Sequence, residues 1–176
     1  MNVRAYVVVA LTFAVALAAY AEETADAQAR MKAVVAKYMN MPGDPAPGIV
    51  LEMAEFVDRE QAIVTVAEAQ IIEAVKKAGI PVLAKGKPQF IVYGGVQSNW
   101  GGQQNAFGTD VVAYEAAITL KIIDVRKGAI IDTASAQVRK VNVNREKASI
   151  EAMKEAGNAA AKKLVAILKA KTGAAQ

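Results

Sequence analysis

The sequence predicts an α+β domain in which a mixed β-sheet is covered by two helices, with an extra helix before it. Two strictly alternating apolar runs, joined by a short turn that contains Gly, are typical of an antiparallel hairpin. A strand-helix-strand pattern precedes them and predicts a parallel crossover. A third strand leads into the hairpin and an Ala-rich helix follows it. The expected order is therefore β-α-β, then an antiparallel β-β-β meander, then a C-terminal helix.

The hairpin is the clearest of these elements. From residue 112 to residue 122 every second residue is apolar or Tyr, and the residues between them include Glu115 and Lys121. The alternation repeats over residues 130–138. Such a pattern places one face of a strand on a core and the other toward water. The Asp-Val-Arg-Lys-Gly sequence at 124–128 predicts the turn between the strands, because Gly tolerates positive φ.

Before the sheet, the chain predicts a helix and a linker. Residues 24–40 place apolar side chains at helical spacing. Residues 41–48 then hold three prolines and two glycines, which predicts a linker or an extended loop. We expect the helix to dock loosely on the domain or to serve as an interaction arm.

The strand-helix-strand unit follows the linker. Residues 49–56 predict the first strand, whereas residues 57–64 are ambiguous. Residues 65–68, Thr-Val-Ala-Glu, match a capping box, in which the Thr hydroxyl accepts a backbone N–H and the Glu side chain reaches back. Gly79 is placed as the left-handed residue that ends the helix. Residues 80–84 then predict a short second strand.

The remaining elements are a third strand, a loop and the last helix. Residues 90–96 are apolar on both faces, as expected for a more central strand. Residues 94–109 hold five glycines and show no apolar period, which predicts a loop. Asn144 is placed to cap a final helix over residues 145–171, whose many Ala residues allow close approach to a sheet.

The N-terminus predicts a secretory signal peptide. Arg4 supplies the positive charge, residues 5–17 supply the apolar region, and Ala19 and Ala21 fit the small-x-small cleavage rule. A membrane anchor is the alternative, but the apolar run is short for a span and lacks a basic flank. We therefore expect a periplasmic protein with no stable membrane span after cleavage, and peripheral contact with the envelope stays open. The predicted organisation is a signal peptide at 1–21, a helix and linker at 22–47, and the main domain at 48–173.

Composition excludes several kinds of chemistry. The chain has no His and no Cys, which removes the Ser-His-acid triad, a Cys nucleophile, and ordinary zinc or haem ligation. A lipoprotein anchor on Cys is excluded for the same reason. The net charge is +4, and the basic residues are interleaved with acids, so we expect no nucleic acid as partner. No phosphate-binding Gly motif is present, and we expect no cofactor.

Carboxylates are the remaining candidates for chemistry. Glu52, Glu55, Asp58 and Glu60 lie close in sequence and could bind a hard cation through oxygen. A solvated strand edge and loop is the simpler interpretation, because the spacing is not that of a calcium loop. A carboxylate-based hydrolase would combine one of these acids with another from the sheet, such as Glu115. We expect neither a metal site nor an enzyme.

The best candidate for binding is the loop predicted at 94–109. It combines aromatic and amide side chains, a composition typical of recognition surfaces. The alternative is a mobile hairpin loop whose Trp merely caps the sheet edge. The candidate binding residues are Gln97, Asn99, Trp100, Gln103, Gln104 and Phe107.

The main domain resembles a group of periplasmic α/β domains. The resemblance rests on residues 49–55 as first strand, 69–82 as helix and second strand, 90–94 as third strand, and 117–128 as a strand that ends in an acid and a Gly turn. These patterns are similar to those of the flagellar assembly protein T middle domain, CsgG, the TolB N-terminal domain and LpoB. The resemblance covers about residues 48–170. The chain departs from several members in that no lipobox Cys and no pore-forming insertion is evident.

The resemblance implies a non-enzymatic protein of the bacterial envelope that binds other proteins or assembles. We therefore expect a protein–protein interaction, with another envelope protein or with a second copy as partner. The alternative is a small-molecule or glycan-binding module that uses the 94–109 loop. A carboxylate hydrolase is a remote third hypothesis.

Overall fold

The computed structural model describes residues 26–62, 65–106 and 108–173. The chain forms two compact units, with the division between Lys37 and Tyr38. A helix covers residues 26–39, which confirms the helix predicted there. The expected signal peptide, with Ala19 and Ala21, lies outside the described residues. Within the described ranges, no helix combines the length and apolar character that a membrane span requires.

The second unit is a five-stranded mixed sheet with two helices. Its elements are β1 (Ala46–Val57), β2 (Glu60–Gln61), α2 (Val66–Lys77), β3 (Pro88–Ala106), β4 (Thr109–Asp124), β5 (Ala129–Asn142) and α3 (Arg145–Gly173). The strand order is β2-β1-β3-β4-β5. β1 and β3 are parallel, and the other neighbouring strands are antiparallel. The predicted α+β class is therefore confirmed.

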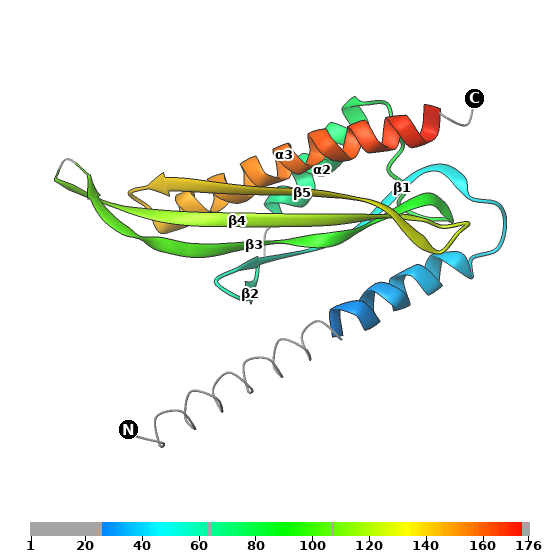
Figure 1. Cartoon of the computed structure of the whole chain (residues 1–176), viewed down its shortest axis with the longest axis horizontal. Coiled ribbons are helices and arrows are strands. Elements are labelled where there is room, and N and C mark those ends of the chain that lie inside the picture. The colour runs from blue at the N-terminus through cyan, green and yellow to red at the C-terminus, as the bar shows by residue number, and fades with distance from the viewer. Residues whose placement is uncertain (1–25, 63–64, 107, 174–176) are drawn as a thin grey trace, which may run out of the picture. The chain divides into compact units, whose positions relative to one another are not determined.

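Both helices cover the same face of the sheet (Figure 1). The core lies between them and the sheet, and its apolar residues from β4 are those of the predicted alternation, such as Ile118 and Leu120. The α3 helix contributes mainly small side chains. Its fully buried alanines are Ala148, Ala152, Ala156, Ala160 and Ala161. Gly157 permits α3 to pack closely against α2, because an added Cβ at this position would lie 3.0 Å from Ala67 Cα.

Three local signals act as predicted. Asn144 caps α3, because its Oδ1 accepts the Lys147 N–H at 3.0 Å. Gly79 follows α2 with a φ of 78°. The turn between β4 and β5 holds Gly128 at a φ of 61°, while Asp124 Oδ1 accepts the Arg126 N–H at 2.9 Å.

The capping box at the start of α2 was predicted wrongly. Thr65 is the N-cap residue, but its side chain makes no capping hydrogen bond. The cap comes instead from Glu55 in β1, whose Oε2 accepts the Val66 N–H at 2.8 Å and whose Oε1 accepts the Glu68 N–H at 2.7 Å. A carboxylate from a neighbouring strand satisfies these amides, so the local hydroxyl is not needed.

The second strand predicted at 80–84 is reduced to a single bridge. Val82 pairs with Ile49 in an isolated parallel bridge, and the parallel partner of β1 is β3. Two hydrogen bonds hold this segment, from Ile49 N–H to the Pro81 carbonyl and from Leu83 N–H to the Ile49 carbonyl, at 2.9 and 2.8 Å. The ladder cannot extend on the N-terminal side of this bridge, because Pro81 has no N–H to donate.

The prediction of a loop at residues 94–109 was also wrong. β3 continues through it to Ala106 and pairs with β4, with one register shift between Trp100 and Gly102. Backbone pairing needs no apolar side chains, so the missing apolar period did not exclude a strand. Gly94 fits this interpretation, because an added Cβ would lie 2.0 Å from the Thr119 carbonyl oxygen. Glycine here permits close approach of two strands.

The ambiguous segment at 57–64 becomes a tight hairpin. Asp58 and Arg59 form its turn, both with positive φ, at 49° and 74°. β1 then pairs with β2 through Phe56 opposite Gln61. Two successive residues with positive φ are typical of the turn that joins two strands by two residues, and Asp tolerates this conformation better than most residues.

Candidate functional site

Trp100 lies on β3 directly opposite Tyr114 of β4, at the register shift. Tyr114 faces the helices and is buried, whereas Trp100 is 52% exposed. The guanidinium carbon of Arg145, the first residue of α3, lies 5.6 Å from the centroid of the indole ring. This is the distance of a cation–π contact, which orients the indole without burying it.

Asp58 accepts hydrogen bonds from the backbone of Trp100 and from the side chain of Tyr114, the residue opposite Trp100. Its Oδ1 accepts the Trp100 N–H at 2.9 Å, and its Oδ2 accepts the Tyr114 hydroxyl at 2.8 Å. The Asp58 N–H donates to the Ser98 carbonyl at 2.9 Å. One turn residue thus ties the β1–β2 hairpin to both β3 and β4 at the site of the exposed Trp. We call these four residues, Asp58, Trp100, Tyr114 and Arg145, the Trp100 cluster.

The electrostatics of the cluster keep Tyr114 as a donor. Burial raises the pKa of the Tyr114 hydroxyl, and the hydrogen bond to Asp58 and the charge of Asp58 raise it further, while Arg145 acts in the opposite direction. The hydroxyl therefore remains protonated at neutral pH. Asp58 accepts this hydrogen bond and that of the Trp100 N–H while its backbone has a positive φ, which costs an L-residue free energy, so the two hydrogen bonds offset local strain.

The other predicted binding residues are divided between the two faces of the β3–β4 hairpin. Gln103 lies opposite Val112 and shares the face of Trp100. Gln97, Asn99 and Gln104 lie on the other face. Gln97 Nε2 donates to Asn99 Oδ1 at 3.1 Å there. The five candidates that lie in the described residues therefore do not form one site.

The end of the hairpin is organised by Asn105. Its Oδ1 accepts the Gly108 N–H at 3.1 Å, and its Nδ2 donates to Asp110 Oδ1 at 3.0 Å. The side chain thus joins the two strands across the turn. Phe107, the second aromatic candidate, lies outside the described residues.

Glu55 and Glu115, the acids considered for a carboxylate pair, lie on opposite faces of the sheet. Glu55 is 2% exposed, and both its oxygens accept backbone N–H groups of α2. Burial raises the pKa of the neighbouring Glu68, and the charges of Glu55 and Glu52 add to the effect. Glu115 projects from the opposite face of the sheet, where its Oε1 lies 3.4 Å from Arg139 Nη1. The geometry that a paired-carboxylate hydrolase needs is thus not formed by Glu55 and Glu115.

Over residues 26–62, 65–106 and 108–173, no group of three or more acidic side chains could hold an ion. Of the four acids close in sequence, Glu52 faces away from the helices and accepts the Tyr38 hydroxyl at 2.6 Å. Glu55 faces the helices instead, so the strand alternation separates the two acids.

Sequence reasoning missed three members of the Trp100 cluster. Asp58 was considered only as an acid, Tyr114 as part of the apolar alternation of a strand, and Arg145 as the first residue of a helix. Asp58 shortly after a predicted strand was the available signal for a turn, because Asp tolerates the left-handed backbone conformation. Nothing local places Arg145 over Trp100, because the two residues are joined only by the tertiary fold.

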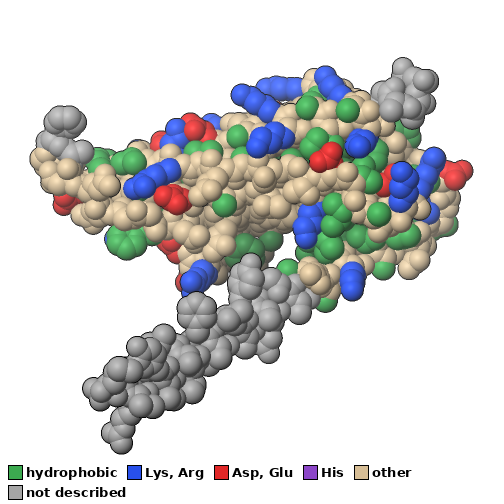
Figure 2. Space-filling model, viewed as in Figure 1, with side chains coloured by type: hydrophobic (Ala, Val, Ile, Leu, Met, Phe, Trp, Pro, Cys, Tyr) green, Lys and Arg blue, Asp and Glu red, His purple; other side chains and the backbone are tan. Residues whose placement is uncertain are grey.

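The face of the molecule shown in Figure 2 carries both positive and negative side chains. On the face shown in Figure 2, Lys and Arg side chains are interspersed with Asp and Glu. Several acid–base pairs form, such as Lys77 with Glu73 at 2.6 Å. Lys77 also holds the pKa of the Glu73 carboxyl below its usual value.

Comparison with known proteins shows distant likeness to solved structures. No family model and no curated protein matches the sequence. A minor lipoprotein from Acinetobacter baumannii is 12% identical, with a TM-score of 0.42 over 72% of this chain and 94% of that chain. A DUF330 protein from Xanthomonas campestris is 9% identical, with a TM-score of 0.42 over 78% of this chain and 92% of that one.

A third similar structure is the PelC dodecamer from Paraburkholderia phytofirmans, which is 18% identical. Its TM-score is 0.38 over 68% of this chain and 92% of that chain. Because these identities and scores are low, the similarities carry no inference about function, location or assembly.

Proposed function

We propose that the chain is an exported protein of the bacterial envelope that acts by protein–protein contact, and that the Trp100 cluster is its docking surface. The observation that carries this proposal is a half-exposed Trp whose backbone is hydrogen-bonded to Asp58. Fixed aromatic side chains are the usual anchors of protein interfaces, because they bury a large area at low entropic cost.

The position of the cluster supports this role. Figure 1 shows β3 and β4 running past the end of β5 and the first turn of α3. In that outer part β3 pairs only with β4, since its pairing with β1 ends at Ser98, and β4 loses its other neighbour where β5 ends opposite Val112. Trp100 therefore lies where the helix layer gives way to the projecting hairpin, which leaves room for a partner beside it.

Two features of the sequence support the location and the class of function. The expected signal peptide at 1–21 supports export to the periplasm. The resemblance to the CsgG, TolB, LpoB and flagellar assembly protein T domains supports a non-enzymatic role in binding or assembly.

Site-specific photo-crosslinking in cells tests the proposal. A photoreactive residue replaces Trp100 in one variant and Ile130 in a control. Ile130 is also exposed, at 47%, but it pairs with Ile123 at the other end of β4. We expect a discrete adduct from position 100 and none from position 130. If the protein is exported and folded but position 100 gives no adduct, the docking role of this cluster is refuted.

A glycan-binding role is the second candidate, because the exposed indole and the Gln103 amide share a face. Sugars stack on indoles and hydrogen-bond to amides. Trp100 is the only Trp in the chain, so its fluorescence reports the site directly. Saturable quenching by envelope oligosaccharides, lost in Gln103→Ala, would favour this candidate over protein docking.

A further inference from the structure

β5 is an open edge of the sheet. It lies at one end of the strand order, and no strand of the described part of the chain pairs along its outer side. From Asp132 to Asn142 it pairs with β4 without a register shift and contains no proline. A straight edge of this length is a template on which another strand can pair.

The outward-facing backbone groups of β5 can be identified. The Thr119 carbonyl points toward β3, because its oxygen lies 2.0 Å from the position of a Cβ on Gly94. In an antiparallel sheet a residue directs its N–H and C=O to the same side. Thr119 lies opposite Ser135, so Ser135 directs both groups away from β4. Gln137 does the same, because the direction alternates along the strand.

Lys163 of α3 forms a hydrogen bond with one of these outward-facing carbonyl groups. Its Nζ donates to the Ser135 carbonyl at 2.6 Å. An added strand would use this same carbonyl, so the ammonium blocks pairing at the middle of the edge. Lys162, the preceding residue, makes no hydrogen bond or ion pair to β5 within the described residues, and it offers a matched control of equal charge.

The side chains of β5 are complementary to those of a second β5 in antiparallel register. Pairing centred on Ala136 places Asp132 opposite Lys140 of the second copy, and both side chains lie on the helix-covered face. It also places Ser135 opposite Gln137, so that their outward N–H and C=O groups can bond reciprocally. Opposite charges facing each other on paired strands are favourable, and here Asp132 of one copy would join Glu155 as a second acid beside Lys140 of the other.

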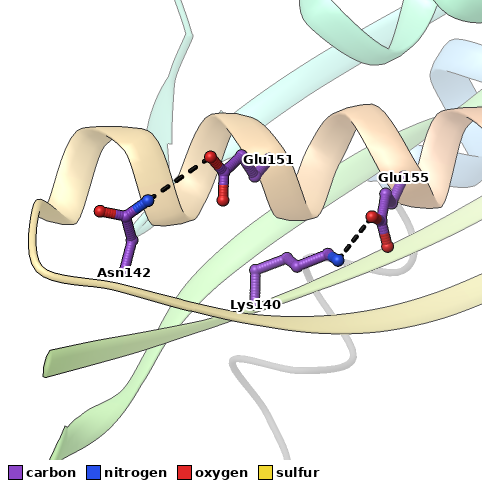
Figure 3. Close-up of polar contacts among 4 residues, drawn as sticks. All are labelled: Lys140, Asn142, Glu151 and Glu155. Atoms are coloured by element: carbon purple, nitrogen blue, oxygen red, sulfur yellow. Dashed lines mark hydrogen bonds and ion pairs between the residues drawn. The ribbon is translucent and has the colours of Figure 1, made fainter.

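The side chains at this edge are held in place by α3. Lys140 forms an ion pair with Glu155, and Asn142 Nδ2 donates to Glu151 Oε1 at 3.4 Å (Figure 3). The edge strand therefore presents a fixed surface. In the register centred on Ala136, the two Lys163 ammonium groups would both approach the centre of the interface, where they repel each other.

We propose that the β5 edge pairs with a second copy of this chain and that Lys163 holds the edge closed in the monomer. This inference concerns the β5 edge, a surface that contains no residue of the Trp100 cluster, and it stands if the docking role of that cluster fails.

Self-association of three variants tests the proposal by sedimentation of the purified full chain. In Lys163→Ala the dissociation constant of the dimer should fall about tenfold or more, since a charge-assisted hydrogen bond no longer occupies the edge. Lys162→Ala should behave as wild type. Adding Gln137→Pro to Lys163→Ala should abolish the gain, because proline removes an outward N–H. Lys163→Ala that associates no more strongly than wild type, or Lys162→Ala with an equal effect, would overturn the proposal.

A disulfide test fixes the register without depending on the proline variant. The chain has no native Cys, so single cysteines report directly. In the Lys163→Ala background, Ala136→Cys should oxidise to a covalent dimer, because the two copies of this residue lie opposite each other on the two-fold axis. Thr133→Cys should not, since it lies opposite Arg139 of the second copy. Equal dimer yields from both positions would refute pairing centred on Ala136.

Discussion

The β3–β4 ladder has two halves that are stabilised in different ways. From Phe90 to Ser98, β3 lies under the helices, and its inward side chains, such as Val92 and Val96, are buried. From Trp100 to Asn105 its described side chains are half-buried or exposed, and Asp58 supplies a clamp from another hairpin. Hydrophobic burial thus stabilises the near half, while backbone pairing and a few polar contacts hold the far half. A strand can be extended beyond its core when a partner strand continues beside it.

The largest expected effect is in the near half. Ile118→Ala removes a fully buried side chain and should lower the free energy of unfolding by about 2–5 kcal/mol. Thr119→Ala is the control, since its side chain is exposed on the opposite face, and it should change stability by no more than about 0.5 kcal/mol. Denaturant unfolding measures both. Similar losses for the two variants would contradict a core on one face only.

Glu55→Gln comes next, at the start of α2. The carboxylate accepts two backbone N–H groups, and an amide can accept only through one of its two polar atoms. We expect a loss of about 1.5–3 kcal/mol in the free energy of unfolding. Glu60→Gln, an exposed acid in β2, should be near neutral. If Glu55→Gln were as mild as Glu60→Gln, the capping role of Glu55 would be excluded.

Asp58→Ala should disturb the far half more than the near half. It removes the acceptors of the Trp100 N–H and the Tyr114 hydroxyl, and it should cost about 1–2 kcal/mol of stability because the site is partly exposed. The emission of Trp100 should shift to longer wavelength as the ring becomes more hydrated. Asp58→Asn keeps one acceptor oxygen and tolerates positive φ, so it should show a smaller shift. An unchanged emission in Asp58→Ala would show that the clamp does not position the indole.

Arg145→Ala should have the smallest effect. The exposed cation–π contact with Trp100 contributes about 0.5–1 kcal/mol. Lys147→Ala, two residues along the same helix, should leave Trp100 emission unchanged, whereas Arg145→Ala should alter it. Equal responses of the two variants would show that charge near the helix terminus, rather than the contact with the ring, affects the indole.

The two halves also differ in how well the sequence predicts them. The apolar alternation from residue 112 to residue 122 predicted the hairpin of β4 and β5, because burial on one face imposes a period of two. The far half of β3 was interpreted as a loop, because its Gly, Gln and Asn side chains show no such period. Its pairing with β4 depends on backbone hydrogen bonds, which leave no pattern in the sequence.

The functional cluster was predictable only in part. Trp100 stands out as the only Trp, in a segment rich in amide side chains. Its partners Asp58 and Arg145 come from 42 residues before it and from the start of α3. Glu55 as the cap of α2 was missed for the same reason. Contacts of this kind depend on the strand order and the helix position, which local patterns do not encode.

Hydrogen–deuterium exchange along β3 and β4 tests most directly whether the far half is an ordered surface held by Asp58. In the wild type we predict protected amides in both halves. In Asp58→Ala, amides from Trp100 to Asn105 should exchange at least about tenfold faster, while those from Phe90 to Ser98 keep their protection. Unprotected far-half amides in the wild type, or equal acceleration of both halves in Asp58→Ala, would contradict an independently held docking surface.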